Sequence, residues 1–293
     1  MVNLPDGASL ERGPGGLERL VLVTRDGEAS VFLHGGHVTH FAPRGSRPVL
    51  WMSAESWYEA GRPIRGGIPV CFPWFGARSG HPGAPAHGVA RLEAWTLEAV
   101  RAETDCRLTA VLRLDRRSGA PLAPDFSFDL HLTVSVGAAL DVELTAVNTA
   151  KDAAVFEEAL HTYFSVSDVR RIHISGLEGL PYLDKVQGMT EQPPNPAPLT
   201  VTAETDRVYL GTSATVTIHD PDWARRTVVE KRGSATTVVW NPWVAKAAAM
   251  PDFGDDEWTG MMCIEAANAR DNAVTVPPGG AHCLATRISV QPA

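Results

Sequence analysis

The sequence lacks an excess of positive charge, a long apolar run and a recognisable leader segment. Its 26 lysines and arginines are outnumbered by 34 aspartates and glutamates, so the net charge is −8 and the pI is near 5.7. A nucleic-acid-binding domain would normally be basic, and we expect no nucleic-acid partner. No apolar run approaches the ~20 residues that cross a bilayer, so we expect no membrane partner either. Residues 1–7 lack the charged and apolar regions of a signal peptide.

Cysteines are few, and none of them forms a C-x-x-C pair. The chain has 293 residues, of which 44% are hydrophobic and 20% charged, so it can bury a large core without disulfides. The cysteines are therefore expected to be reduced core thiols of a cytoplasmic protein. They are Cys71, Cys106, Cys263 and Cys283.

Helical periodicity is also scarce, and the dominant hydrophobic period is two. Apolar and polar residues alternate from 126 to 136 and, after a turn at 137–139, again to 145, which predicts a hairpin. Residues 106–115 alternate in the same way, whereas residues 53–60 are expected to form a helical turn or two. Further strands are predicted at 19–24, 29–34, 155–166, 170–175, 214–219, 226–230, 236–240, 260–266 and 282–290.

Many short strands, punctuated by 26 glycines and 22 prolines and not separated by helices, predict an all-β fold. The expected architecture is a large antiparallel β-sandwich with few short helices. The proline-rich residues 192–198 could link two domains. Strand patterns continue on both sides of this stretch, however. His161 precedes it and Glu265 follows it, and both are candidate catalytic residues. We therefore expect a surface loop within a single domain of residues 1–293.

Glu265 is the most informative residue, because it is a lone carboxylate in the apolar run 260–268. Burying an ionised carboxylate is costly, so this one is expected to be paired or held at a raised pKa for proton transfer. His161 occupies a similar hydrophobic run at 156–164. A carboxylate and an imidazole on hydrophobic strands are the parts of a general base and a general acid.

Arginines gather between residues 41 and 95, where six of them face only three acids in a chain that is acidic overall. Arg65 opens a segment rich in glycine, proline and aromatic residues that ends at Gly76, and Arg91 closes a second glycine-containing motif. Guanidinium groups bind phosphate in bidentate fashion, so these two arginines predict an anion site. Scattered surface arginines are the alternative.

Two more polar residues are candidates for substrate contact. Asp206 could accept hydrogen bonds from sugar hydroxyls, or it could cap a turn. His87 lies four residues before Arg91 and, considered alone, is more simply a structural residue.

Two other patterns do not indicate a metal. His34, His37 and His40 are spaced by three residues, and such steps along a strand place successive side chains on opposite faces. The acidic residues 252–257 lack the positions of a calcium loop and are expected to form a solvated connection. We expect no metal site.

Taken together, six segments resemble the D-hexose-6-phosphate mutarotases (glucose-6-phosphate 1-epimerases), a branch of the aldose 1-epimerase superfamily. They occur in the family's order and span roughly residues 30–290. Ala86 stands where some members carry Gln, so any side-chain contact from that position is absent here. Val89 stands where Phe or Leu is frequent, which should affect packing more than chemistry. The segments are residues 65–76, 87–91, 161–164, 205–209, 239–243 and 262–268.

The resemblance implies a galactose mutarotase-like β-sandwich with the sugar site on its concave face. It places the general acid at His161 and the general base at Glu265. The residues that it assigns to substrate contact are Arg65, His87, Arg91 and Asp206, with the phosphate on the two arginines.

In the implied reaction, ionised Glu265 takes the proton of the anomeric hydroxyl while protonated His161 gives one to the ring oxygen. The ring opens, the C1–C2 bond rotates, and closure reverses the transfers without a metal or redox cofactor. Both pKa values should lie near neutrality, and Glu157 is expected to keep His161 protonated. We expect a monomeric epimerase acting on a small phosphorylated hexose.

Three alternatives stay open. An aldose 1-epimerase for unphosphorylated sugars gives no reason for two converging guanidinium groups. A non-catalytic sugar-phosphate-binding protein gives no reason for His161 and Glu265. A glycosidase usually needs two carboxylates at a set separation, and Glu265 has no partner acid in a comparable motif.

Overall fold

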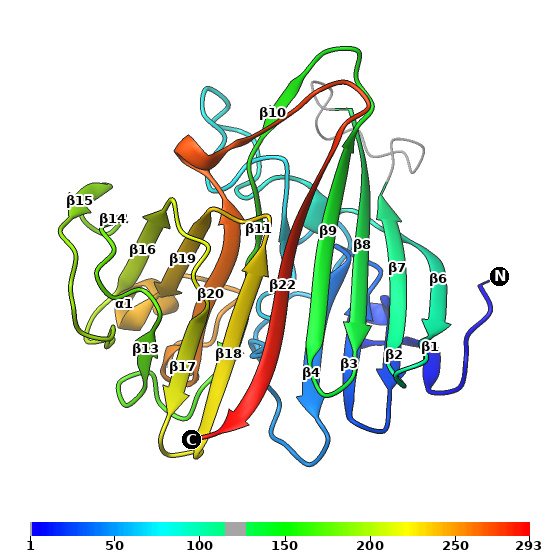
Figure 1. The fold of residues 1–293 in the computed structure, drawn as a ribbon, viewed down its shortest axis with the longest axis horizontal. Helices are drawn as coiled ribbons and strands as arrows, with labels where there is room; N and C mark the ends of the chain where they lie inside the picture. Colours follow the sequence, from blue (N-terminus) through cyan, green and yellow to red (C-terminus); the bar gives the residue numbers. More distant parts are fainter. Residues whose placement is uncertain (1, 115–126) are drawn as a thin grey trace.

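Two large antiparallel sheets make up most of the structure (Figure 1). The computed structural model describes residues 2–114 and 127–293. Within these residues each large sheet has eight strands, a third sheet has four and a fourth has two. The prediction of an all-β antiparallel fold with few helices is confirmed. Asp115 and Phe126, at the ends of two predicted strands, lie outside the described residues.

The first large sheet, here called the outer sheet, runs across the view of Figure 1 in the order β13-β17-β18-β22-β9-β8-β7-β6. The predicted hairpin is its β8–β9 pair, in which buried Leu132 faces buried Leu144. Its strands are β6 (Thr96–Ala102), β7 (Leu108–Leu114), β8 (Phe128–Val136), β9 (Leu140–Asn148), β13 (His173–Ser175), β17 (Val216–Asp220), β18 (Arg225–Arg232) and β22 (Ala281–Pro292).

The second large sheet, here called the site sheet, has the order β15-β14-β16-β19-β20-β11-β5, and β12 also pairs with β20. Every residue of β19 and β20 is buried, so both faces of this part of the sheet are covered. Its strands are β5 (Val70–Cys71), β11 (Glu158–Leu160), β12 (Tyr163–Ser165), β14 (Tyr182–Asp184), β15 (Thr190–Gln192), β16 (Thr205–Leu210), β19 (Thr236–Asn241) and β20 (Met261–Asn268).

Smaller elements complete the described part of the chain. The α-helix found there, α1 (Trp243–Ala248), is short, and no helix in that part is long and apolar enough to span a membrane. The remaining strands are β1 (Ala8–Arg12), β2 (Glu18–Val23), β3 (Gly27–Phe32), β4 (His37–Pro43), β10 (Ala154–Phe156) and β21 (Val274–Val276). The 3-10 turns are η1 (Pro14–Gly16), η2 (Ala90–Leu92), η4 (Glu257–Gly260) and η5 (Arg270–Asn272).

Some local predictions are wrong. Residues 53–60 form turns and irregular backbone, and the helix lies instead at 243–248, directly after Pro242. The strand predicted at 155–166 is interrupted at residue 157 and again at 161–162, which divides it into β10, β11 and β12. Of the proline-rich residues 192–198, Gln192 ends β15 and the others form an exposed loop, which leads toward β16 of the same sheet.

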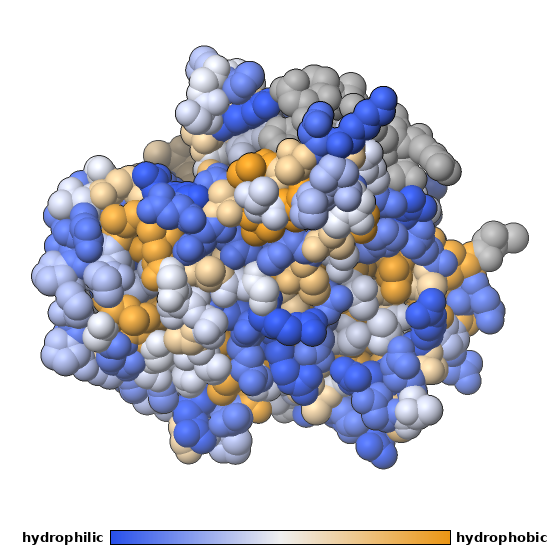
Figure 2. Space-filling view, turned by 45° about the horizontal axis from the view of Figure 1, so that its top comes forward, coloured by the Kyte–Doolittle hydropathy of each residue, from blue (hydrophilic) through white to orange (hydrophobic). Residues whose placement is uncertain are grey.

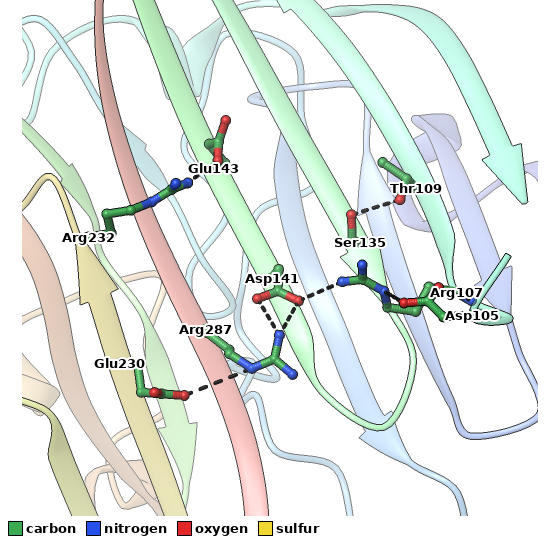
Figure 3. Close-up of polar contacts among 9 residues, drawn as sticks. All are labelled: Asp105, Arg107, Thr109, Ser135, Asp141, Glu143, Glu230, Arg232 and Arg287. Atoms are coloured by element: carbon green, nitrogen blue, oxygen red, sulfur yellow. Dashed lines mark hydrogen bonds and ion pairs between the residues drawn. The ribbon is translucent and has the colours of Figure 1, made fainter. Parts of the chain in front are cut away.

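The molecular surface carries hydrophobic residues only in small, separate patches on the face drawn in Figure 2, where hydrophilic residues dominate. The outer sheet accounts for part of this polarity, because ion pairs link its neighbouring strands (Figure 3). Asp141 of β9 accepts hydrogen bonds from Arg287 of β22 at 2.7 Å and from Arg107 at 3.2 Å. Such cross-strand pairs stabilise the solvated face of a sheet whose other face forms the core.

Gly88 joins the segment that carries His87 to the strand region of the site sheet. Its φ is +74°, and a Cβ at this position would lie 2.0 Å from the carbonyl oxygen of Phe72, with which Gly88 forms a parallel β-bridge. A side chain here is therefore excluded both by the backbone conformation and by the close approach of the second segment.

Gly88→Ala is expected to lower the free energy of unfolding by about 1–3 kcal/mol, because the strained backbone and the clash must be relieved together. Gly83→Ala is the matched control, since Gly83 lies in the same loop and a Cβ there meets nothing within 4 Å. Urea unfolding of both variants provides the measurement. Equal effects of the two substitutions would contradict this assignment.

Candidate active site

A cavity of about 240 Å³ lies over the site sheet. This volume is somewhat below the range of about 300–1,000 Å³ of drug-sized ligands and suits a monosaccharide. All six residues singled out from the sequence line it, so the structure brings them together. They are Arg65, His87, Arg91, His161, Asp206 and Glu265.

His161 and Glu265 form a pair at the base of this cavity, with 3.4 Å between Nε2 of His161 and Oε1 of Glu265. The interruption between β11 and β12 produces this contact. Leu160 pairs with Ala266 and Tyr163 pairs with Cys263, so residues 161–162 lie opposite residues 264–265 of β20. Both side chains are almost fully enclosed, with 8% of His161 and 1% of Glu265 exposed.

Burial sets the protonation of this pair. It raises the pKa of Glu265 well above the ordinary carboxyl value, and the nearby negative charge of Asp206 raises it further. Burial also lowers the pKa of His161 well below its ordinary value, and the positive charges of Arg91 and Arg65 add to this effect. Both shifts favour the uncharged forms of the two groups, a neutral imidazole and a protonated carboxyl group.

This protonation differs from the expected one, in which Glu157 holds His161 in its charged form. Glu157 lies in the break between β10 and β11, where its carboxylate accepts hydrogen bonds from the backbone N–H of Phe75 at 3.0 Å and of Arg270 at 2.6 Å. Its charge is thus used to hold two loops. A continuous strand would have placed Glu157 on the same face as His161, but the strand is interrupted at residue 157 and again at residues 161–162.

His87 adds an imidazole to the lining of the cavity. Burial lowers the pKa of His87 well below its ordinary value, and the positive charge of Arg91 contributes to the same shift. Its Nδ1 accepts a hydrogen bond from the backbone N–H of Gly76 at 3.4 Å, which leaves the proton on Nε2. The ring lies edge-on to that of His161, with the centroids 5.4 Å apart.

Arg65 is committed to partners within the protein. Its guanidinium donates to both carboxylate oxygens of Asp252, at 3.0 and 3.1 Å, and to the hydroxyl of Tyr163 at 3.0 Å. The ring of Tyr163 in turn stacks on that of His161, with 4.9 Å between centroids and 10° between planes. The chain Asp252–Arg65–Tyr163 therefore braces the imidazole.

The acidic segment 252–257 is thus not the solvated connection that its composition predicted. Asp252 is only 4% exposed, and Glu257 accepts hydrogen bonds from the hydroxyl of Ser53 at 2.7 Å and the backbone N–H of Ala54 at 2.9 Å. Only Asp255 and Asp256 are exposed. A run of acids shows no periodicity that would distinguish its buried members from its solvated ones.

Arg91 is engaged much less than Arg65. One of its terminal nitrogens donates to the carbonyl oxygen of Ala86 at 2.8 Å, and its Nε is buried without a hydrogen-bond partner. The other arginines of the basic stretch do not line this cavity. Arg62 and Arg47 lie over the rings of Trp57 and Trp223.

Sequence reasoning missed two lysines of the cavity. Lys185 lies 3.2 Å from a carboxylate oxygen of Asp206, and Lys246 lies 2.8 Å from one of Glu204. Asp206 is 4% exposed, and burial raises its pKa above the ordinary value. Lys185 follows the short strand β14 and Lys246 lies on α1, which was not predicted, so no local pattern marked either residue.

The three regularly spaced histidines do not converge. His34 and His37 bond the carbonyl oxygens of Arg62 and Gly66 at 2.7 Å, while His40 contacts Glu28. Among the residues that the structure describes, no group of three His, Cys, Asp or Glu side chains could hold a metal ion.

A family model described as aldose 1-epimerase matches residues 19–289. The chain belongs to the aldose 1-epimerase family. The His161–Glu265 pair and the sugar-sized cavity are consistent with epimerase chemistry, and the enzyme is an isomerase of this family.

Two curated relatives are similar to this chain over most of its length. The chain is 34% identical over 287 residues to a protein of Cenchrus ciliaris named "Putative glucose-6-phosphate 1-epimerase", covering 93% of this chain and 84% of the relative. A protein of Escherichia coli K12 with the same name is 34% identical over 266 residues, covering 90% and 87% of the two chains.

Solved structures confirm the galactose mutarotase-like fold. A Salmonella typhimurium protein described as a "putative mutarotase (YeaD)" superposes with a TM-score of 0.90 at 30% identity, covering 100% of this chain and 96% of that one. A galactose mutarotase-like protein of Clostridium acetobutylicum has a TM-score of 0.73 at 13% identity, with 98% of both chains covered.

Asp252→Asn is expected to lower the free energy of unfolding by about 3–5 kcal/mol, because it leaves the charge of Arg65 without its buried counterion. Asp255→Asn is the matched control in the same loop, where an exposed carboxylate should change stability by less than about 0.5 kcal/mol. Chemical denaturation followed by tryptophan fluorescence measures both. A loss below about 1 kcal/mol at Asp252 would mean that the pair does not brace the site.

Proposed function

We propose that this family member is a hexose-6-phosphate 1-epimerase, which interconverts the α and β anomers of a phosphorylated hexose. The observation that carries the proposal is the buried His161–Glu265 pair, 3.4 Å apart, beside two arginines in one sugar-sized cavity. The names of the relatives described above support the same substrate class.

In the proposed reaction Glu265 is the base and His161 the acid. The carboxylate of Glu265 takes the proton from the anomeric hydroxyl, C1=O1 forms as the C1–O5 bond breaks, and imidazolium His161 gives its proton to O5. Rotation about C1–C2 presents the other face of the aldehyde. Ring closure then returns both protons, so the enzyme is restored without any other reactant.

The charges around the pair favour one orientation of the sugar. Arg91 and Arg65 are the charges that act most strongly on His161, whereas Asp206 and Lys185 act on Glu265. In an aldohexose the C6 arm leaves the ring next to O5, which is the atom that His161 serves. A 6-phosphate therefore points toward the arginines, while His87 and Asp206 are left for the ring hydroxyls.

The proposal includes the whole chain acting as one domain and as a monomer. His161 and Glu265 stand on opposite sides of the proline-rich loop in sequence and still belong to one cavity, which supports a single unit. Few large apolar side chains are exposed among the residues that the structure describes, which supports a monomer. They are Leu10, Val23, Val155, Val186 and Val244. The four cysteines are unpaired, which fits a reducing cytoplasm.

Glu265→Gln is expected to abolish most of the anomer interconversion while substrate still binds, because the amide keeps the shape of the carboxylate but cannot accept the proton. The assay follows the relaxation of pure α-glucose 6-phosphate to anomeric equilibrium by NMR or polarimetry, with the uncatalysed rate subtracted. Exposed Glu191 of β15 supplies the control variant Glu191→Gln, which should retain full activity. Unchanged turnover by Glu265→Gln would remove the proposed mechanism.

Arg91→Gln is expected to reduce the preference for phosphorylated sugar. Hydrogen bonds to charged groups contribute about 1.5–3 kcal/mol, so the ratio of kcat/KM for glucose 6-phosphate to that for glucose should fall roughly 10–100-fold. Arg47→Gln is the control, since Arg47 lies over Trp223 and outside the cavity. An unaltered ratio would favour an aldose 1-epimerase for unphosphorylated sugars.

A further inference from the structure

We propose that the phosphate of the substrate, once held at Arg91, drives the shared proton from Glu265 to His161 and so converts the resting pair into its reactive form. The phosphate would then be an activator of catalysis as well as a handle for binding. This inference rests on the proposed function, and it adds a regulation of that site by its own substrate.

The first observation is that Arg91 is the cation of the cavity without a countercharge. No carboxylate of the described residues lies within ion-pair distance of Arg91, whose Nε is buried and unpartnered. The other three cations are each paired: Arg65 with Asp252 at 3.0 Å, Lys185 with Asp206 at 3.2 Å and Lys246 with Glu204 at 2.8 Å. A dianion that enters the cavity therefore finds the uncompensated positive charge at Arg91.

The second observation is that Arg91 and the imidazole of His161 line the same cavity. Arg91, His87 and His161 all line it, and the rings of the two histidines lie 5.4 Å apart. Charges are poorly screened around buried groups, and after burial itself the positive charge of Arg91 contributes most to the lowered pKa of His161. Neutralising Arg91 removes that repulsion.

The remaining groups around His161 do not cancel this effect. His87 is neutral, and Tyr163 is a buried phenol whose pKa is raised by burial. The charge of Arg65 is already balanced by Asp252, so binding of an anion changes it less. Apart from burial, the pKa of Glu265 is affected by the charges of Asp206 and Lys185 and not by that of Arg91, so the anion acts on one member of the pair more than on the other.

The step itself is a transfer of one proton within the pair. The O–H bond of the Glu265 carboxyl group breaks and an N–H bond forms on Nε2 of His161, which leaves a carboxylate and an imidazolium. The number of protons on the pair does not change, and no other reactant is needed. The product is the charged acid and base that ring opening requires.

Inorganic phosphite and D-xylose test the inference, because D-xylose has the ring of glucose without its C6 arm and leaves room for the dianion. In wild-type enzyme, phosphite should accelerate the mutarotation of D-xylose at least about tenfold, which corresponds to a pKa change of one unit. The rate measured with phosphite and the Glu265→Gln variant is subtracted, because it already includes catalysis by phosphite alone.

Arg91→Gln gives the second arm of this experiment. The substitution removes the repulsion permanently, so the mutarotation of D-xylose without phosphite should rise and phosphite should no longer accelerate it. Failure of phosphite to accelerate the wild-type reaction, at concentrations that inhibit turnover of glucose 6-phosphate, would overturn the inference. Failure of phosphite to compete with glucose 6-phosphate would overturn it as well.

A direct measurement of protonation separates this inference from the proposed function. The nitrogen chemical shifts of His161, assigned by comparison with His161→Gln, should change to those of imidazolium when 1,5-anhydroglucitol 6-phosphate binds. That compound has no anomeric hydroxyl and cannot react, and 1,5-anhydroglucitol without phosphate should leave His161 neutral. If the enzyme turns over glucose 6-phosphate but the nitrogen chemical shifts of His161 do not change, the inference alone is wrong. If there is no turnover, the proposed function is wrong.

Discussion

The pairing of one buried strand with a broken one is the constraint on which the site depends. Strand β20 has no exposed residue, yet it carries Glu265. The neighbouring segment of the chain pairs with β20 through β11 and then through β12, and this strand pairing is interrupted at residues 161–162. A continuous strand would have buried His161 as an ordinary core residue. The interruption keeps the carboxyl group and the imidazole within 3.4 Å while opening both to a cavity.

Compensation of charge is the second organising feature. Polar groups enclosed to this degree are stable only with partners, and most of the cavity's charges have them within the protein. Asp252 holds Arg65, and through Tyr163 this pair fixes the plane of His161, whose Nδ1 is buried without a hydrogen bond. Arg91 remains outside this compensation. A ligand that supplies the missing negative charge therefore gains energy that a neutral ligand does not.

Much of this could be predicted from the sequence, for identifiable reasons. Strict alternation and frequent turns specify strands, and Glu265 stands out because a carboxylate in an apolar run demands an explanation. Contacts between residues far apart in the chain have no comparable signal in the sequence. The roles of Asp252 and Lys185 depend on which loops meet over the sheet, and regular geometry wrongly placed Glu157 beside His161. The protonation of the pair depends on its burial and on Arg91 and Arg65, which only the folded chain defines.

A resting pair without net charge resolves a conflict between stability and catalysis. In the proposed mechanism the acid and base of ring opening are charged, but keeping an ion pair almost wholly out of water costs free energy in every folded molecule. With a neutral imidazole and a protonated carboxyl group this cost is absent until substrate arrives. If the arriving phosphate supplies the field that separates the charges, its binding energy is used on the reacting atoms rather than on affinity alone. Selectivity for an anionic sugar then arises in the chemical step itself, because a neutral sugar fills the same cavity without creating the acid that it needs.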